Sequence, residues 1–224
     1  MAWLIVQNIS LSYDKSSNII SNLSFTATTG DSILLEGRNG IGKTTILKSI
    51  AGIIKPVTGK ILIDGHDVSS VSYTKRKKLV SLAQQSPNYS PPIKVSEFLE
   101  IALLENFSSL SSQRRIKRFV NLLEIEELLL RPINTLSEGQ KKLALLCRTF
   151  IQGSEVILLD EPDAFLDIYN QKLVINAINE IVSEGKIVIF VSHNEHFYSQ
   201  ICNKKIQILS NSEFLTLEMD KIMS

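Results

Sequence analysis

Residues 37–45 have the types and spacing of a phosphate-binding loop, because they read Gly-Arg-Asn-Gly-Ile-Gly-Lys-Thr-Thr and match G-x-x-x-x-G-K-[ST]. Glycines let the backbone turn its N–H groups toward an anion, and the start of a following helix adds partial positive charge. Lys43 would reach the β- and γ-phosphates, and the Thr44 hydroxyl would bind Mg²⁺. The sequence therefore predicts a nucleoside triphosphate site. Its expected binding residues are Gly37, Arg38, Asn39, Gly40, Ile41, Gly42, Lys43, Thr44 and Thr45.

The segments on either side have the order that a phosphate loop requires. The apolar run at 32–36 predicts a strand before the loop, and helical spacing over 46–51 predicts a helix after it that stops at Gly52. The alternative is a glycine-rich turn before an ordinary helix. Both flanks and the Lys43-Thr44 pair favour phosphate binding instead.

Two carboxylates end a second apolar strand, at 155–160. Buried charge without a partner is costly, and a Mg²⁺ ion beside a triphosphate would be such a partner. We expect Asp160 to support the metal held by Thr44, and Glu161 to polarise a water for attack on the γ-phosphate. Acidic residues are also common at strand ends. Together with the phosphate loop, however, they favour a ligand site, because parallel α/β sheets gather ligand sites where their strands end.

A third motif is Leu-Ser-Glu-Gly-Gln at residues 136–140. Ser137 and Gln140 fit an S-x-x-Q capping box that opens an amphipathic helix, which is a sufficient structural reason for both. A capped helix start with a glycine beside it is also an anion site. The motif therefore predicts a helix start with the capacity to bind phosphate.

The remaining pattern alternates strands and helices and predicts an α/β chain with an all-helical insertion at 86–150. The turn at 86–92 holds three prolines, which exclude regular structure there. Further strands are expected at 3–13, 22–29, 60–65 and 186–191, helices from about 96, at 111–130 and at 168–184, and a closing hairpin at 205–209 and 213–217.

With these motifs in this order, the chain resembles the nucleotide-binding subunit of ATP-binding cassette (ABC) transporters over nearly its whole length. Residues 136–140 resemble that family's signature, LSGGQ. The resemblance implies an α/β fold with a P-loop NTPase core, a mostly parallel sheet, N-terminal antiparallel strands and the helical subdomain. It also implies a single ATPase domain over 1–224, with its core at 1–85 and 151–224, and ATP and Mg²⁺ as cofactors.

The resemblance assigns roles to three more residues. Gln84 would contact Mg²⁺ and the attacking water, although its neighbour Gln85 leaves that assignment open by one position. Tyr13 would stack on adenine, and His193 would reach the γ-phosphate. The implied catalytic residues are Lys43, Gln84, Glu161 and His193, and the implied metal-binding residues are Thr44, Gln84 and Asp160.

In this family two subunits pair head to tail, and each ATP lies between the phosphate loop of one and the signature of the other. Ser137, Gly139 and Gln140 would then serve the opposite chain's nucleotide, and residues 164–167 would cross the dimer. The implied partners are a second cassette, identical or not, integral membrane subunits that dock on the 86–92 loop and the helical insertion, and in some systems a substrate-binding protein.

Two positions depart from the family pattern. Glu138 replaces the first glycine of the signature and places negative charge near a phosphate site, which Lys141 and Lys142 are expected to offset. Asp163 stands where threonine or serine is commoner, and the sequence offers no physical reason for it. Neither change removes a catalytic group, so an active ATPase is expected.

Bulk composition limits the function classes. The chain has 224 residues, 44% hydrophobic and 21% charged, which is typical of a globular protein. A net charge of +1 gives no sign of nucleic-acid binding. The basic run at 75–78 reads as a solvated helix face, with contact to anionic lipid headgroups as an alternative.

The sequence also predicts the cellular compartment of the protein. Cys147 and Cys202 lie far apart, which fits a reduced chain, and Cys147 is expected to be buried. No apolar run is long enough to span a bilayer, and the first residues lack the features of a signal peptide. We therefore expect a cytoplasmic protein, bound at the inner face of the cell membrane through its partner.

The leading functional hypothesis is the energy-coupling ATPase of a transporter. One alternative is a soluble ABC protein of DNA repair or translation, although such proteins usually carry two cassettes or long coiled-coil insertions. Another is a scaffold ATPase of the iron–sulfur-cluster assembly type. Residues 161–168 with Gln171 resemble importers of siderophores, haem or cobalamin, and small exporters share much of this pattern.

Overall fold

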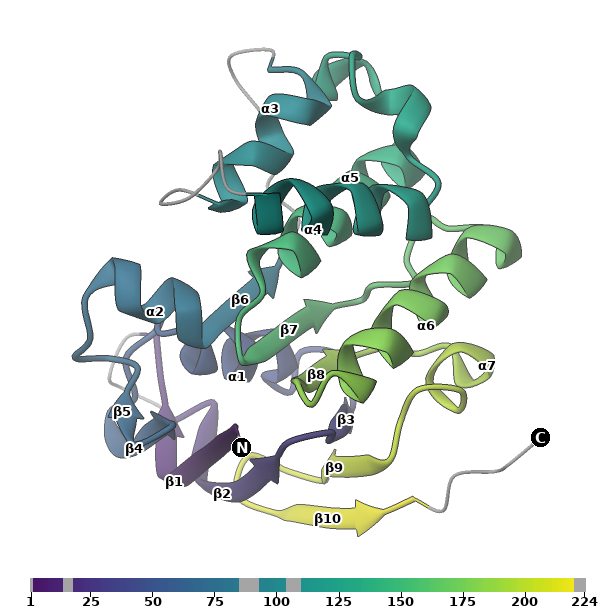
Figure 1. Ribbon diagram of the computed structural model, residues 1–224. Coiled ribbons are helices and arrows are strands. Elements are labelled where there is room, and N and C mark those ends of the chain that lie inside the picture. Colours follow the sequence, from purple (N-terminus) through teal and green to yellow (C-terminus); the bar gives the residue numbers. More distant parts are fainter. Residues whose placement is uncertain (1, 14–17, 85–92, 104–109, 220–224) are drawn as a thin grey trace.

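Two β-sheets, with helices on both faces of the larger one, make up the part of the chain that the computed structural model describes, residues 2–13, 18–84, 93–103 and 110–219 (Figure 1). The expected proline-rich loop at 86–92 and the alternative residue Gln85 lie outside these ranges.

The smaller sheet is antiparallel and has the strand order β2-β1-β4-β5. Its strands are β1 (Trp3–Leu11), β2 (Ile20–Thr28), β4 (Thr58–Ile63) and β5 (His66–Asp67). The prediction of antiparallel strands at the N-terminal end is therefore confirmed.

The larger sheet has the order β10-β9-β3-β8-β7-β6, and it is parallel except for its edge strand β10. Its strands are β3 (Ser32–Gly37), β6 (Val80–Ala83), β7 (Val156–Asp160), β8 (Ile187–Val191), β9 (Lys204–Ile208) and β10 (Phe214–Glu218). The mostly parallel sheet and the closing hairpin of β9 and β10 are as predicted. Because β3, β8, β7 and β6 are parallel neighbours, their carboxyl ends meet at one edge.

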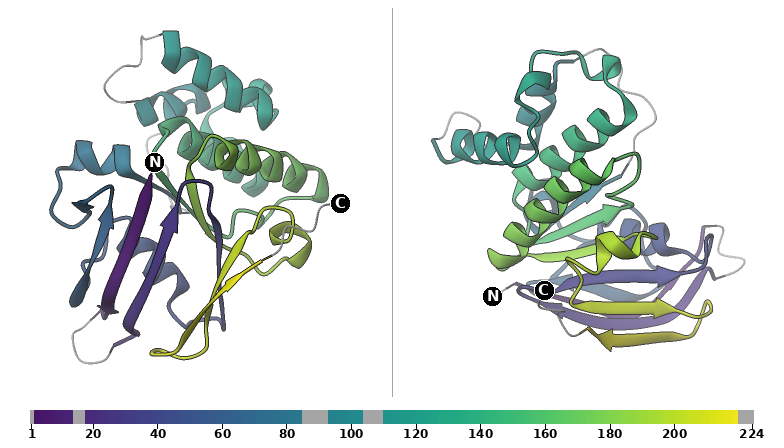
Figure 2. Two further views of the ribbon diagram at one scale, coloured as in Figure 1. Left: turned by 60° about the horizontal axis from the view of Figure 1, so that its bottom comes forward. Right: turned by 90° about the vertical axis from the view of Figure 1, so that its right-hand side faces the viewer.

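Helices cover both faces of the larger sheet. The helix α1 packs between the two sheets, whereas α5 and α6 lie on the opposite face, with α3 and α4 beyond them (Figures 1 and 2). The helices are α1 (Lys43–Ile50), α2 (Tyr73–Leu79), α3 (Val95–Glu100), α4 (Leu110–Leu122), α5 (Glu138–Gln152), α6 (Ile168–Ser183) and α7 (Glu195–Tyr198), with 3₁₀ turns at Ile101–Leu103, Glu126–Leu128 and Ile133–Thr135.

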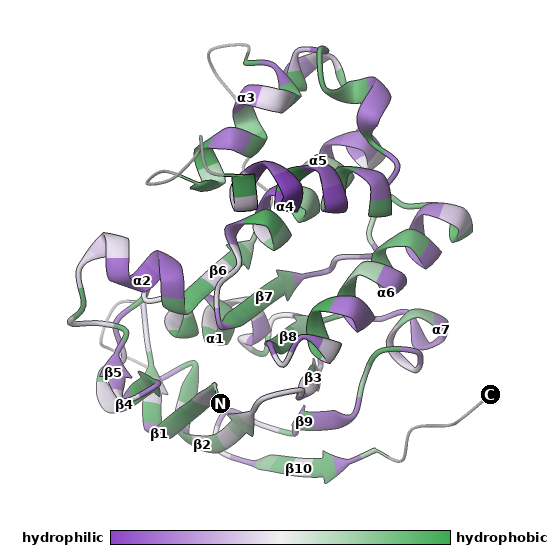
Figure 3. Ribbon diagram, in the orientation of Figure 1, coloured by the Kyte–Doolittle hydropathy of each residue, from purple (hydrophilic) through white to green (hydrophobic). Residues whose placement is uncertain are grey.

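The strand β7, between β8 and β6, supplies side chains to two separate cores. Ile157 and Leu159 join the cluster under α5 and α6, while Val156 and Leu158 join the cluster around α1. All four are fully buried, as expected for a strand whose side chains alternate between two covered faces. The continuous hydrophobic colour of β7 in Figure 3 reflects this double burial.

The predicted single helix over 111–130 is wrong. The helix α4 ends at Leu122, and Glu124 adopts a left-handed conformation (φ 51°). The Ile125 N–H then bonds to the Val120 carbonyl at 3.1 Å, which closes the helix end as in a Schellman motif. Ile125 and Leu128 are buried beyond this turn, so the apolar spacing continues although the helix does not.

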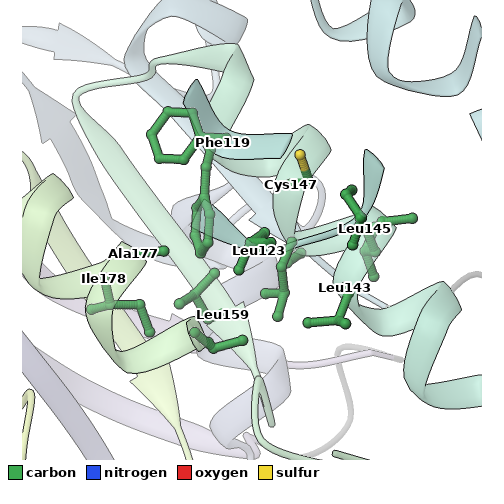
Figure 4. Close-up of a cluster of buried hydrophobic side chains, with 14 of the residues drawn as sticks. Phe119, Leu123, Leu143, Leu145, Cys147, Leu159, Ala177 and Ile178 are labelled. Atoms are coloured by element: carbon green, nitrogen blue, oxygen red, sulfur yellow. The ribbon is translucent and has the colours of Figure 1, made fainter. Parts of the chain in front are cut away.

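Side chains from four elements fill the core between the helices and the larger sheet. Figure 4 shows Phe119 of α4, Leu145 of α5, Leu159 of β7 and Ala177 of α6 in one cluster. The Phe119 ring is fully buried and lies 5.7 Å from that of Phe150, centroid to centroid. Cys147 is also buried there, as predicted.

Replacing Phe119 with alanine should lower the free energy of unfolding by about 3–5 kcal/mol, because the cavity cannot fully collapse. Urea denaturation measures this change. The matched control is Leu130→Ala, since Leu130 is 77% exposed and should change stability by no more than about 0.5 kcal/mol. A loss below about 1 kcal/mol for Phe119→Ala would show that this cluster does not hold α4 in place.

Candidate functional site

The loop at 37–45 joins β3 to α1, as predicted. Lys43 is buried, and its ammonium group donates hydrogen bonds to the carbonyl oxygens of Gly37 (2.7 Å) and Arg38 (3.1 Å). Gly42 has φ 113°, a conformation that favours glycine, and no side chain caps α1 behind it. The N–H groups of the first helical turn are therefore available to an anion.

The Thr44 hydroxyl donates a hydrogen bond to the carboxylate of Asp160, with 2.9 Å between Oγ1 and Oδ2. Burial raises the pKa of Asp160, and the bond from Thr44 only partly opposes this. Burial also lowers the pKa of Lys43, against the attraction of Glu161 and Asp160. A hydroxyl beside a partly desolvated carboxylate is a donor pair suited to a hard cation such as Mg²⁺, whose charge would offset the cost of burial.

Strand register brings Gln84 to the same place. The strands β6 and β7 pair as far as Ala83 and Leu159, so Gln84 lies beside Asp160 where both strands end. Gln84 is half-buried there. The structure thus groups the predicted glutamine with the predicted metal-binding carboxylate.

Glu161 and His193 continue this edge. The N–H of Glu161 donates to the carbonyl of Val191 at 3.0 Å, which ties the end of β7 to the end of β8. Glu161 has φ 49°, so the chain turns sharply at this residue, and its side chain is exposed. His193 follows β8 by two residues and is exposed.

Tyr13 stands over the start of α1. Its hydroxyl lies 3.0 Å from Oγ1 of Thr45, and its side chain is 67% exposed. A ring tethered at its polar end and open to solvent can serve as a stacking platform for a planar base.

Residues 136–140 form the predicted capping box at the start of α5. The Gln140 N–H donates to the Ser137 hydroxyl at 3.2 Å, and the Ser137 N–H donates to the Gln140 side chain at 3.1 Å. Within the described part of the chain, no hydrogen bond joins Ser137, Gly139 or Gln140 to residues 37–45. The structure therefore does not bring these two motifs of one chain together.

The two lysines after the signature have different environments. Lys141 pairs with Glu138 at 2.8 Å, as predicted. The same prediction for Lys142 is wrong, because this side chain is only 4% exposed and donates to the carbonyl of Asp160 at 3.3 Å. Burial lowers the pKa of Lys142, against the attraction of Asp160, Glu161 and Asp163.

Lys142 was missed as a site residue, although it lies on the apolar face of α5, where a lysine needs a reason. Its position also gives a physical account of Asp163, whose carboxylate attracts this buried ammonium. One oxygen of Asp163, Oδ1, is buried and has no hydrogen-bond partner among the described residues.

Comparison with known proteins identifies this arrangement. A model of the family described as ABC transporter matches residues 20–164. The chain belongs to the ABC transporter family. An ABC transporter ATP-binding protein of Bacillus cereus is 30% identical over 95% of this chain and 38% of its own length. The achromobactin transport ATP-binding protein of Dickeya dadantii is 27% identical, over 95% of this chain and 81% of its own.

The chain spans about two fifths of the length of several curated relatives. It covers 38% of the Bacillus cereus protein and 38% of one from Photobacterium profundum.

Solved structures confirm the predicted fold class. An ATP-binding subunit of an ABC transporter superposes with a TM-score of 0.88 at 22% identity, over 98% of this chain and 91% of the other. A dimeric cassette in a post-hydrolysis state with ADP and phosphate gives a TM-score of 0.85 at 19% identity, over 97% of this chain and 99% of the other.

Within the described ranges, no helix combines the length and apolar character that crossing a bilayer requires.

The substitution Asp160→Asn should stabilise the nucleotide-free cassette. Because burial raises the pKa of Asp160, the folded chain binds this proton more tightly than the unfolded chain, and the group's contribution to stability is lost as the pH rises through the folded pKa. Near neutral pH, Asp160→Asn should raise Tm by about 2–4 °C, and the gain should shrink toward about pH 4.

Thermal unfolding without nucleotide across a pH series measures this difference. The control is Glu127→Gln, which removes an exposed carboxylate and should change stability by no more than about 0.5 kcal/mol. A lower Tm for Asp160→Asn near neutral pH would mean that attraction to Lys142 outweighs the cost of burial.

Proposed function

We propose that this cassette binds ATP with Mg²⁺, hydrolyses it, and thereby powers transport by a membrane partner. The observation that carries the proposal is the hydrogen bond from Thr44, in the phosphate loop, to Asp160, with Glu161 as the next residue. This contact supports the proposal because it joins the start of α1 to the carboxyl end of β7, where a hydroxyl and two carboxylates follow one another closely.

Each group of the loop has a distinct task. Lys43 would exchange its bonds to the carbonyls of Gly37 and Arg38 for bonds to the β- and γ-phosphates. The first-turn N–H groups of α1 would bind the remaining phosphate oxygens. Tyr13 would stack on the adenine with its exposed ring, while its hydroxyl stays on Thr45.

Thr44, Asp160 and Gln84 would hold Mg²⁺, which neutralises charge on the β- and γ-phosphates when bound. Glu161 would accept a proton from the attacking water, since its carboxylate is exposed directly after Asp160 at the end of β7. His193, beside it on the loop after β8, would donate to the γ-phosphate. These are the groups that in-line attack on a terminal phosphate requires.

The site is completed by a second cassette, identical or not. Ser137, Gly139 and Gln140 would approach the γ-phosphate bound by the other chain. Among the described residues, they make no hydrogen bond to the phosphate loop of their own chain, which agrees with this role. A dimeric cassette with ADP and phosphate among the similar folds supports this arrangement. ATP would then hold two chains together until the γ-phosphate is cleaved.

Transport is favoured over a scaffold role by the relatives, which are named as transporter ATP-binding proteins. The cassette would lie at the inner face of the cell membrane, bound to integral membrane subunits through the helical segment between β6 and β7. The 161–168 segment with Gln171 and the similarity to an achromobactin transport protein favour a metal-chelate importer, which would also use a substrate-binding protein.

Glu161→Gln should lower kcat for ATP hydrolysis by about 10²–10⁴-fold, because it removes the base and keeps the shape of the side chain. Affinity for ATP should change by less than about threefold, since Glu161 does not belong to the phosphate loop. Phosphate release and binding of a fluorescent ATP analogue measure the two effects. Glu127→Gln serves as a control for loss of an exposed carboxylate. Unchanged turnover in Glu161→Gln would assign the base to another residue.

An affinity-tagged cassette, purified from its native cells in mild detergent, should bring down a polytopic membrane protein in about equimolar amount. Transport requires such a partner, because no helix among the described residues can span a membrane. Mass spectrometry of the purified complex identifies the partner. Recovery of soluble assembly proteins in its place would refute the transport role.

A further inference from the structure

We propose that Gln171 is a positioning residue, through which the turn at 163–166 sets the loop that carries His193. The inference rests on the proposed ATPase function. It adds a path within one chain from the signature, which would contact the ATP of the other chain, to His193, which would contact the chain's own ATP.

The side chain of Gln171, on the second turn of α6, bridges two loops. Its Nε2 donates to the carbonyl oxygen of Leu166 at 3.0 Å, and its Oε1 accepts from Nδ2 of Asn194 at 3.1 Å. Asn194 directly follows His193, and its own N–H donates to the Ser192 hydroxyl at 3.1 Å. One half-buried amide therefore connects the turn after β7 to the loop after β8.

Both ends of this bridge fix its polarity. The Leu166 carbonyl can only accept, so the amide nitrogen of Gln171 must face it. At the other end, Oδ1 of Asn194 accepts from the N–H of Phe197 at 3.2 Å, which directs the Asn194 amide nitrogen toward Gln171. The position thus requires a side chain with a donor and an acceptor at this reach.

The far side of the 163–166 turn touches the signature. Phe165 has φ 66°, a strained conformation for a phenylalanine, and its carbonyl oxygen lies 2.8 Å from where a β-carbon on Gly139 would be. The backbone of this turn therefore lies against the signature, where a phosphate of the other chain would bind. Gln171 contacts both Leu166 of this turn and Asn194, so it can pass a displacement of the turn to the loop of His193.

The fold itself does not need this amide. The helix α6 is capped by Asp167, whose carboxylate accepts from the Asn170 N–H at 2.8 Å, and is anchored by buried residues such as Val174 and Ile178. Asn194 caps α7 independently of Gln171. Loss of the amide should therefore affect the chemistry of the site more than stability.

The test compares Gln171→Met with Lys172→Met, which places the same side chain at the next, exposed position of α6. Both are assayed as full-length chains, at a concentration where turnover per chain is constant. Gln171→Met should lower kcat by about 10–100-fold, through misplacement of a catalytic group. Its KM, its affinity for a fluorescent ATP analogue and its melting temperature should match those of Lys172→Met. Unchanged kcat, or a loss explained by unfolded chain, overturns the inference.

A double-mutant cycle with His193→Ala shows whether Gln171 acts through the histidine. Single-turnover rates with radiolabelled ATP should fall for each single variant, and Gln171→Met should slow the His193→Ala chain by less than about twofold. The inference is overturned if the rate losses of Gln171→Met and His193→Ala multiply in the double variant, or if His193→Ala keeps full activity.

Gln171→Glu provides a second variant of nearly the same shape. It keeps the acceptor for Asn194 but turns a carboxylate oxygen toward the Leu166 carbonyl, so it should lose as much kcat as Gln171→Met. Wild-type kcat in Gln171→Glu would overturn the link to the 163–166 turn. A wild-type chain that binds ATP and never hydrolyses it refutes the proposed function itself, and the inference falls with it; a hydrolysing wild type with an equally active Gln171→Met refutes the inference alone.

Discussion

A carboxylate at the end of a fully buried strand is the constraint on which this structure depends. Hydrophobic burial on both faces holds β7 between β8 and β6, and the same burial removes much of the water that would solvate Asp160. Neighbouring groups offset that cost: the Thr44 hydroxyl donates to the carboxylate, and the Lys142 ammonium sits on the backbone of the same residue. Without a cation, the pKa of Asp160 still lies above its usual range, because burial outweighs the bond from Thr44. The chemistry of the site follows from a charge that the fold leaves partly uncompensated.

The layered core makes this edge rigid. Alternate residues of β7 belong to different clusters, so the strand cannot shift without disturbing packing on both faces. The phosphate loop, Gln84, Glu161 and the His193 loop all leave neighbouring strands of this sheet at the same end. Turns carry the functional groups, and the strands fix where those turns begin.

How much of this could be predicted from the sequence depends on the range of the interactions. The phosphate loop, the Asp160 strand and the capping box are local patterns with strict spacing, and each was found where it was predicted. The end of α4 was missed, because Ile125 and Leu128 keep the apolar period after the helix has stopped. The contacts of Lys142 and Gln171 were not predicted, because their partners, Asp160 and Asn194, lie 18 and 23 positions away, and only the fold brings them together.

The capping box orders the start of α5 before any ligand binds there. Ser137 and Gln140 satisfy each other, and Lys141 holds the charge of Glu138, so the helix start keeps its shape with no ligand present. In the described part of the chain, the N–H groups of Glu138 and Gly139 have no hydrogen-bond acceptor. A phosphate that arrives at this surface meets two donors already in place, and little conformational entropy is lost in ordering them. The entropy cost of forming the complete site would then fall on bringing two chains together.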